Sequence, residues 1–295
     1  MTDKPNLTCL KALLDAVMTD IKQKIATKSN DTKNKMVAQN LNALIDSFSK
    51  GDLIVFSGRP GMGKTSFVLN IAERKGIYDN QPIVLFCPGI NKKTLALKLL
   101  CMNANVAYSH TSHGYLTNDG YQKIINSARL IANAPIYMDD TPIVSLKDIE
   151  TKVRKLNKYL CVLGKKLSLV IVDYLQLMGE TSEKSRKRTS EVLKYLKDIA
   201  VRNELPLLVI SEIKRIENAP YFSDTVDAVS ELFVSGCADH SDTVLVLSRE
   251  SYYDRDLSDE RREFAEIHIL RSRSFYENDI PLLFKKECFR FEDRL

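Results

Sequence analysis

The chain has 295 residues, 44% of them hydrophobic, which fits one large α/β domain with an appendage or two small domains. Its formal net charge of +5 permits a nucleic-acid partner without requiring one. The 6 cysteines include no C-x-x-C pair, so we predict reduced thiols, mostly buried, and neither a disulfide framework nor a cysteine zinc site. No apolar run approaches the roughly 20 residues of a membrane span, and the polar N-terminus indicates no signal peptide. We expect one main cytoplasmic domain.

Apolar residues at helical spacing predict an amphipathic helix from Leu10 to Ile25. The polar stretch 28–35 is predicted to be a linker, so residues 1–35 are expected to form a helix and linker, and 36–295 the main domain. The apolar face of this helix has to be buried on its own domain or on a neighbouring copy, and the sequence leaves both open. A second short helix, from Val37 to Phe48, is expected before the first strand.

A phosphate-binding pattern, G-x-x-x-x-G-K-[ST], follows the apolar run 53–56 and precedes the helical run 67–72. In this strand–loop–helix context glycines allow backbone N–H groups to point at phosphate oxygens, the lysine approaches the β and γ phosphates, and the hydroxyl completes a Mg²⁺ shell. We therefore predict that the chain binds ATP and Mg²⁺, the alternative being a chance glycine-rich turn. The predicted nucleotide-binding residues are Gly58, Arg59, Pro60, Gly61, Met62, Gly63, Lys64, Thr65 and Ser66.

Beyond this loop, apolar runs of strand length alternate with helical patterns, which indicates an α/β fold with a mainly parallel sheet covered on both faces. The runs are Ile83–Cys87, Ile136–Met138, Leu169–Val172, Leu207–Ile210 and Val244–Leu247. Two later stretches, 266–270 and 280–284, alternate more and are predicted to form an edge hairpin.

Asp173 ends the run Leu169–Val172 and is the second candidate site residue. A carboxylate at the carboxyl end of a buried parallel strand, beside a phosphate loop, is where a Mg²⁺ shell is completed. Alone the signal is weak, since many strands stop at a polar residue. Together with the loop it predicts a metal site formed by Thr65 and Asp173.

Three strings resemble the motor domain of DnaB-type replicative DNA helicases. They are Gly51–Val55 leading into Arg59–Thr65, Ala134–Pro142, and Val172-Asp173-Tyr174-Leu175-Gln176-Leu177-Met178. The resemblance runs from about Leu41 to Phe291. It implies a RecA-like P-loop NTPase fold, a homohexameric ring with ATP between subunits, movement along single-stranded DNA, and contacts with other replication proteins. It also implies that the N-terminal helix is the family's linker helix, and that the separate N-terminal domain, which meets primase, is missing.

Two departures from the family pattern concern catalysis. Gly89 stands where the family has the glutamate that activates water, and a lost general base typically costs about 10²–10⁴-fold in rate. Ser211-Glu212 stands where the family has a Ser-Gln sensor. Glu212 is then either a relocated base, a carboxylate that repels the triphosphate, or a solvated residue.

Further positions carry expectations about phosphate and DNA. Arg271 and Arg273 occupy the place of the family's arginine finger, so we predict that they contact the γ phosphate of the neighbouring subunit; the alternative is a charged edge strand. Lys214 and Arg215 are the predicted DNA-binding residues, although the segment 216–224 that follows is acidic and aromatic, which should weaken binding to the DNA backbone.

The two aromatic residues of that segment, Tyr221 and Phe222, either stack on bases or pack locally. The 4 histidines show no ligand spacing with cysteines or carboxylates, so no zinc site is predicted. Three hypotheses follow. The first, which the fold and most motifs favour, is an ATP-driven DNA helicase or translocase with Lys64, Asp173, Glu212, Arg271 and Arg273 in its catalytic site. The second is a degenerate relative that binds nucleotide but hydrolyses it poorly. The third is a RecA-like recombination or signalling ATPase, against which the string that follows Asp173 argues.

Overall fold

The computed structural model describes residues 39–142, 145–173, 184–213, 239–249, 251, 259–273 and 279–294. From Asn40 onward these residues belong to one compact unit. Several predictions lie outside the described residues: the N-terminal helix and linker, the string 174–178, Lys214, Arg215 and the segment 216–224. The boundary at residue 35 and the roles of these segments stay predictions.

A nine-stranded sheet, in the order β3-β2-β4-β5-β1-β6-β7-β8-β9, forms the centre of the described unit. Its strands are β1 (Leu53–Gly58), β2 (Ile83–Phe86), β3 (Ile136–Asp139), β4 (Leu169–Val172), β5 (Leu207–Glu212), β6 (Thr243–Ser248), β7 (Phe264–Arg271), β8 (Asp279–Lys285) and β9 (Arg290–Asp293). The first six pair in parallel and the last three antiparallel. The predicted α/β class and mainly parallel sheet are confirmed.

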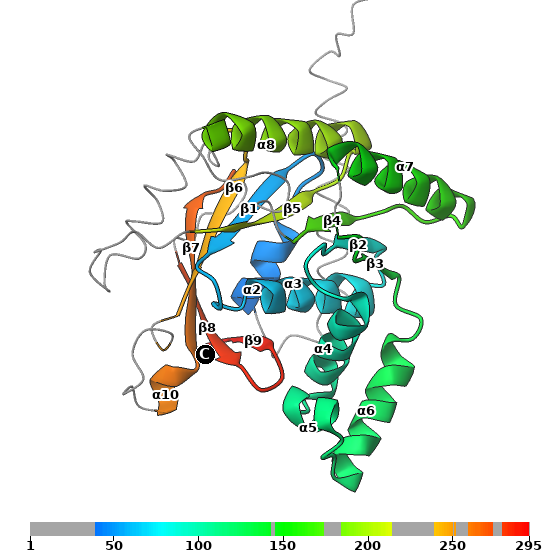
Figure 1. Cartoon of the computed structure of the whole chain (residues 1–295), viewed down its shortest axis with the longest axis vertical. Coiled ribbons are helices and arrows are strands. Elements are labelled where there is room, and N and C mark those ends of the chain that lie inside the picture. Colours follow the sequence, from blue (N-terminus) through cyan, green and yellow to red (C-terminus); the bar gives the residue numbers. More distant parts are fainter. Residues whose placement is uncertain are drawn as a thin grey trace, which may run out of the picture. The chain divides into compact units, whose positions relative to one another are not determined.

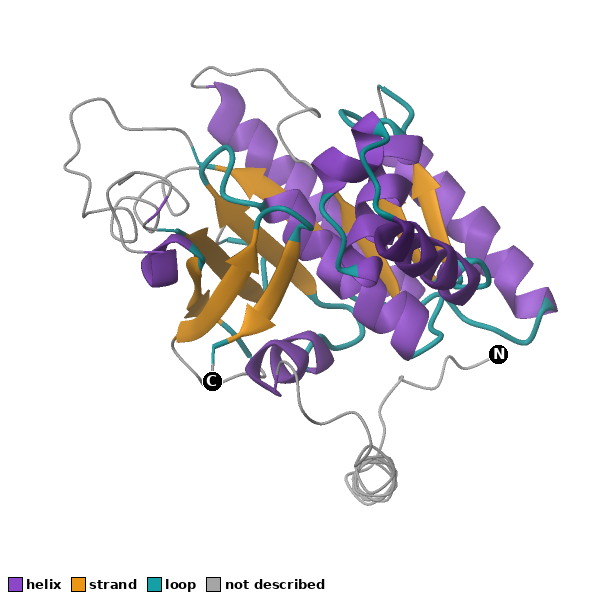
Figure 2. Cartoon of the chain, turned by 90° about the horizontal axis from the view of Figure 1, so that it is seen from below, coloured by secondary structure: helices purple, strands orange, loops and turns teal. Residues whose placement is uncertain are grey.

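Helices cover both faces of this sheet (Figures 1 and 2). They are α2 (Gln39–Asp46), α3 (Lys64–Ala72) with its π-helical continuation η2 (Glu73–Tyr78), α4 (Lys92–Ala104), α5 (Tyr108–His113), α6 (Asn118–Ile131), α7 (Leu146–Val162), α8 (Lys184–Asn203) and α10 (Asp259–Arg262). Among the described residues, no helix combines the length and the apolar character needed to cross a bilayer.

The parallel strands are long apolar runs because both of their faces are buried. On β1, Leu53 and Val55 belong to the cluster that packs against α7 and α8. Phe56 is also buried and stacks on Phe67 of α3, with 4.4 Å between ring centroids. Each such fully buried side chain contributes about 1.5–3 kcal/mol of hydrophobic stabilisation. This packing fixes the position of the loop between β1 and α3.

The C-terminal strands differ from the prediction in one respect. The predicted hairpin is present as β7 and β8, but it does not form the edge of the sheet, because β9 pairs with β8 and takes the edge. We missed β9 because its four residues offer too short a pattern to be separated from a turn. Phe291 of β9 stacks on Phe284 of β8 at 4.3 Å and lies edge-on to Phe67, so tertiary packing stabilises this short strand.

Candidate nucleotide-binding site

The loop between β1 and α3 has the backbone shape that phosphate binding requires. Gly61 and Gly63 have φ angles of 76° and 105°, a region that residues with a side chain rarely adopt. Gly63 caps the N-terminus of α3, which begins at Lys64. A Cβ atom on Gly58 would lie 2.9 Å from the carbonyl oxygen of Leu247, so β6 leaves no room for a larger residue there. The positive end of the α3 dipole therefore opens onto a loop suited to an anion.

Lys64 is held inside this loop. Its Nζ donates hydrogen bonds to the carbonyl oxygens of Gly58 at 2.7 Å and Arg59 at 2.8 Å. Burial lowers the pKa of Lys64, and the negative charges of Glu212 and Asp173 offset part of that effect. A partly desolvated ammonium held by carbonyl groups gains from an incoming phosphate, which would supply an anionic acceptor.

Thr65 and Asp173 meet as the sequence predicted. The Thr65 hydroxyl donates to Oδ2 of Asp173 at 2.7 Å, although the two residues are 108 positions apart. Asp173 is buried, and burial raises the pKa of its carboxyl group, against the hydrogen bond from Thr65 and the charge of Lys64. A buried carboxylate and a hydroxyl side by side are oxygen ligands of the kind that Mg²⁺ takes, so these two residues fit that ion.

The carboxyl ends of the parallel strands bring Glu212 to the same edge of the sheet. Glu212 ends β5 directly opposite Gly58 of β1, and its charge acts on both Lys64 and Asp173. Gly89 lies in an exposed turn that follows β2, and it offers no side chain that could take a proton. Glu212 therefore offers a carboxylate at this edge of the sheet, and its negative charge acts to raise the pKa of Lys64 against the larger effect of burial.

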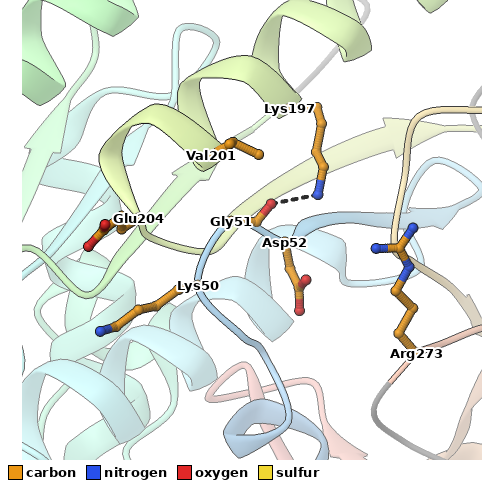
Figure 3. Close-up of a pocket in the computed structure, with 7 residues that line it drawn as sticks. All are labelled: Lys50, Gly51, Asp52, Lys197, Val201, Glu204 and Arg273. Carbon is orange, nitrogen blue, oxygen red and sulfur yellow. Dashed lines mark hydrogen bonds between the residues drawn. The ribbon is translucent and has the colours of Figure 1, made fainter. Parts of the chain in front are cut away.

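Arg271 and Arg273 lie at the opposite edge of the sheet. β7 runs antiparallel to β6, so Arg271 pairs with Val244 at the beginning of β6. Arg273 then forms an ion pair with the buried Asp242 at 2.9 Å, and it lines a pocket of about 480 Å³ with Asp52 and five other residues (Figure 3). Neither arginine is therefore placed to act on a nucleotide in the loop of its own chain.

Sequence reasoning missed two cationic residues near the loop. Arg249 directly follows β6, is 8% exposed, and lies over the Phe284 ring at 4.5 Å; its Nε has no hydrogen-bond partner among the described residues. The Phe284 ring is also 3.3 Å from the position of a Cβ atom on Gly63. Lys98 of α4 is partly buried, which lowers its pKa, while the charge of Asp173 raises it. The position of Arg249 after a buried strand at this edge was a usable signal, whereas nothing in the pattern of α4 marks Lys98.

Comparison with known proteins identifies the family. The family model described as "DnaB-like helicase C terminal domain" matches residues 35–293. This chain belongs to the DnaB-like helicase C-terminal domain family. The resemblance inferred from the sequence strings is thereby confirmed.

Two curated relatives illustrate how much of a whole helicase the chain matches. It is 30% identical over 255 residues to "Replicative DNA helicase DnaB" of Geobacillus stearothermophilus, covering 85% of this chain and 54% of the relative. It is 32% identical over 263 residues to "Probable replicative DNA helicase" of Trieres chinensis, covering 86% and 56%. The chain thus spans little more than half the length of these two relatives.

Solved structures of related proteins share the fold. One of them, a solved ATPase domain, matches with a TM-score of 0.73 and 21% identity, covering 96% of this chain and 99% of that one. "The Structure Of A DnaB-Like Replicative Helicase And Its Interactions With Primase" also matches with a TM-score of 0.73 and 21% identity, covering 99% and 68%. The predicted RecA-like ATPase fold of the DnaB-like type is confirmed.

Proposed function

We propose that this chain is the ATP-hydrolysing motor of a DnaB-like helicase that moves along single-stranded DNA in replication, in the cytoplasm. The observation that carries the proposal is the contact between Thr65 and Asp173 beside the loop that holds Lys64, in a chain of this family. Lys64 would bind the β and γ phosphates, and Thr65 and Asp173 would hold Mg²⁺. The ion would neutralise charge that develops on the phosphates.

The same proposal assigns the arginines to a neighbouring copy. Arg271 and Arg273 lie at the edge of the sheet away from the loop, so they can contact a γ phosphate only if it is bound by another subunit. A homohexameric ring, in which each copy offers its loop to one neighbour and its arginines to the other, satisfies this requirement. Lys214 and Arg215 are proposed to contact the DNA backbone.

Gly89 favours a second candidate, a nucleotide-binding partner in replication with little hydrolysis. Without a carboxylate at that turn, hydrolysis requires another general base, and Glu212 is a carboxylate outside the proposed metal site whose charge acts on Lys64. The motor hypothesis therefore makes Glu212 the base. The binding hypothesis makes it dispensable.

Steady-state ATP hydrolysis by the full chain, with and without single-stranded DNA, separates the two candidates. A motor predicts turnover that DNA stimulates, that Lys64→Ala abolishes and that Glu212→Gln lowers by about 10²-fold or more while nucleotide binding persists. Nucleotide binding with turnover no higher than that of Lys64→Ala would overturn the motor proposal and leave the binding partner. Lys123→Ala, at an exposed ion pair with Asp119 on α6, is a control that should change neither quantity.

A further inference from the structure

Three potential metal ligands meet on one face of the sheet, apart from the phosphate loop. Glu266 and His268 alternate along β7, so both side chains point to the same face, and His268 lies directly opposite Asp279 of β8. One ligand atom from each of the three residues lies within 4.8 Å of the other two. The sequence prediction found no ligand spacing around the histidines; it overlooked that a separation of two residues is a shared face once the segment is a strand.

We propose that Glu266, His268 and Asp279 form a binding site for a divalent transition-metal ion, Zn²⁺ in particular. An imidazole nitrogen and a carboxylate are ligands that Zn²⁺ takes, and a second carboxylate at the other ring nitrogen is the usual outer partner of such a histidine. The proposal concerns a face of β7 and β8 that takes no part in the proposed ATP chemistry, so it does not rest on the motor function.

Hydrogen bonds already orient the imidazole as a metal ligand requires. His268 Nδ1 lies 2.8 Å from Oδ1 of Asp279, and with its proton on Nδ1 the ring donates to this carboxylate. The lone pair is then on Nε2, which lies 2.9 Å from the Ser248 hydroxyl and 3.7 Å from Oε2 of Glu266. A carboxylate that fixes the tautomer of a ligating histidine in this manner is the usual outer partner of a metal site.

The separation between Nε2 and Glu266 fits an ion placed between them. Zinc–nitrogen and zinc–oxygen bonds of about 2.0–2.2 Å at a tetrahedral angle put two ligand atoms roughly 3.4 Å apart. The observed 3.7 Å requires only a small movement of the Glu266 side chain, which is 29% exposed. Water would complete the shell beside the Ser248 hydroxyl, and Asp279 would keep the ring oriented through Nδ1.

The surroundings allow an ion to enter and give it a structural effect. The His268 side chain is 12% exposed, whereas that of Asp279 is 49% exposed, so the site opens to solvent on the β8 side. Ser248, His268 and Asp279 belong to three adjacent strands, β6, β7 and β8. A bound ion would therefore link β6, β7 and β8 to one another. β7 is also the strand that ends at Arg271.

Zinc titration of the metal-free full chain by calorimetry tests the proposal. We expect one saturable site, with at least a tenfold loss of affinity in both His268→Asn and Glu266→Gln, and a loss of about 10–100-fold in Asp279→Asn. Zn²⁺ should also raise the melting temperature of the wild type and of neither ligand variant. His268→Asn and Glu266→Gln are tested separately, so the result does not depend on one variant. Circular dichroism checks that each variant is folded.

Controls separate this site from other zinc-binding groups. Affinity should be unchanged in His113→Asn, whose ring bonds locally within α5, and in Asp173→Asn at the phosphate loop. Co²⁺ in place of Zn²⁺ should give a spectrum without thiolate charge transfer, since the proposed ligands include no cysteine. The proposal is overturned if no saturable binding occurs, if His268→Asn binds like wild type, if Asp173→Asn removes the binding, or if the cobalt spectrum shows thiolate ligation.

Discussion

Replacing Gly63 with Ala tests the geometry on which the phosphate loop depends. Gly63 has a φ of 105°, and a Cβ atom there would lie 3.2 Å from the Phe291 ring and 3.3 Å from the Phe284 ring. These rings stack on one another at 4.3 Å and link β8 and β9 to the loop. The substitution therefore strains the backbone and displaces an aromatic pair at the same time.

The size of the effect follows from these two contributions. An Ala at a sparsely populated positive φ costs about 1–3 kcal/mol. Forcing a methyl group against packed rings costs about 1–3 kcal/mol more, because the interior cannot give way freely. We expect a loss of about 3 kcal/mol in the free energy of unfolding, which for a domain of this size lowers the melting temperature by roughly 6–12 °C.

Gly164→Ala is the matched control, since Gly164 also has a positive φ, 68°, but a Cβ atom there would meet nothing within 4 Å. It should lose only about 1–2 kcal/mol. Urea unfolding of both variants measures the difference, which we expect to be about 1–2 kcal/mol, and binding of a fluorescent ATP analogue shows whether the loop still functions. Equal losses of stability in the two variants would refute the argument from ring contacts.

Further predictions concern two buried carboxylates, Asp173 and Asp242. Asp173→Asn should lower by at least tenfold the gain in ATP affinity that Mg²⁺ provides, measured with a fluorescent analogue with and without Mg²⁺; an unchanged gain would contradict the assignment of the ion to Asp173 and Thr65. Because burial raises the pKa of Asp173 above its ordinary value of 3.8, ionising this carboxyl costs folding free energy once the pH exceeds that ordinary value, so this variant should be at least as stable as wild type near pH 7 without ligand. Asp242→Ala should cost about 3 kcal/mol in urea unfolding, because Asp242 is 2% exposed and pairs with Lys197 at 2.5 Å, whereas Arg273→Ala, at a side chain 66% exposed, should cost less than about 1 kcal/mol. A loss in Arg273→Ala as large as that in Asp242→Ala would show that the surface arginine stabilises the pair more than its exposure implies.

The parts of the fold that could be predicted are those in which local pattern and tertiary environment agree. Runs such as Leu169–Val172 are continuously apolar because helices cover both faces of the sheet. The structure confirms this run as the buried strand β4. The contact between Thr65 and Asp173 was predictable because parallel strands end at one edge. Predicting this contact required only the order of the helices and strands along the chain, and no knowledge of side-chain packing.

The parts that could not be predicted depend on contacts between distant segments. Arg290 donates to the buried Glu73 at 2.8 Å across 217 positions, and no local pattern marks either residue as a partner. Arg249 is an intermediate case: its position after a buried strand could have been used, but its contact with the Phe284 ring on another strand could not be predicted. A strand as short as β9 likewise exists because of the aromatic residues it meets, so propensity alone gave no signal.

The two edges of the sheet constrain how copies of this chain can cooperate. The loop with Lys64 lies at the carboxyl edge of the parallel strands, and Arg273 lies at the amino edge, where it is paired with Asp242. A nucleotide contacted by both must therefore lie between two copies in a head-to-tail interface, which closes into a ring when the rotation between copies permits. Asp242 also accepts hydrogen bonds from Lys197 and from the Leu53 amide, so its charge would stay compensated if, as proposed, Arg273 turned to a neighbouring copy. Releasing the arginine then costs little, and the carboxylate that holds it also holds the first residue of β1, the strand that ends at the phosphate loop.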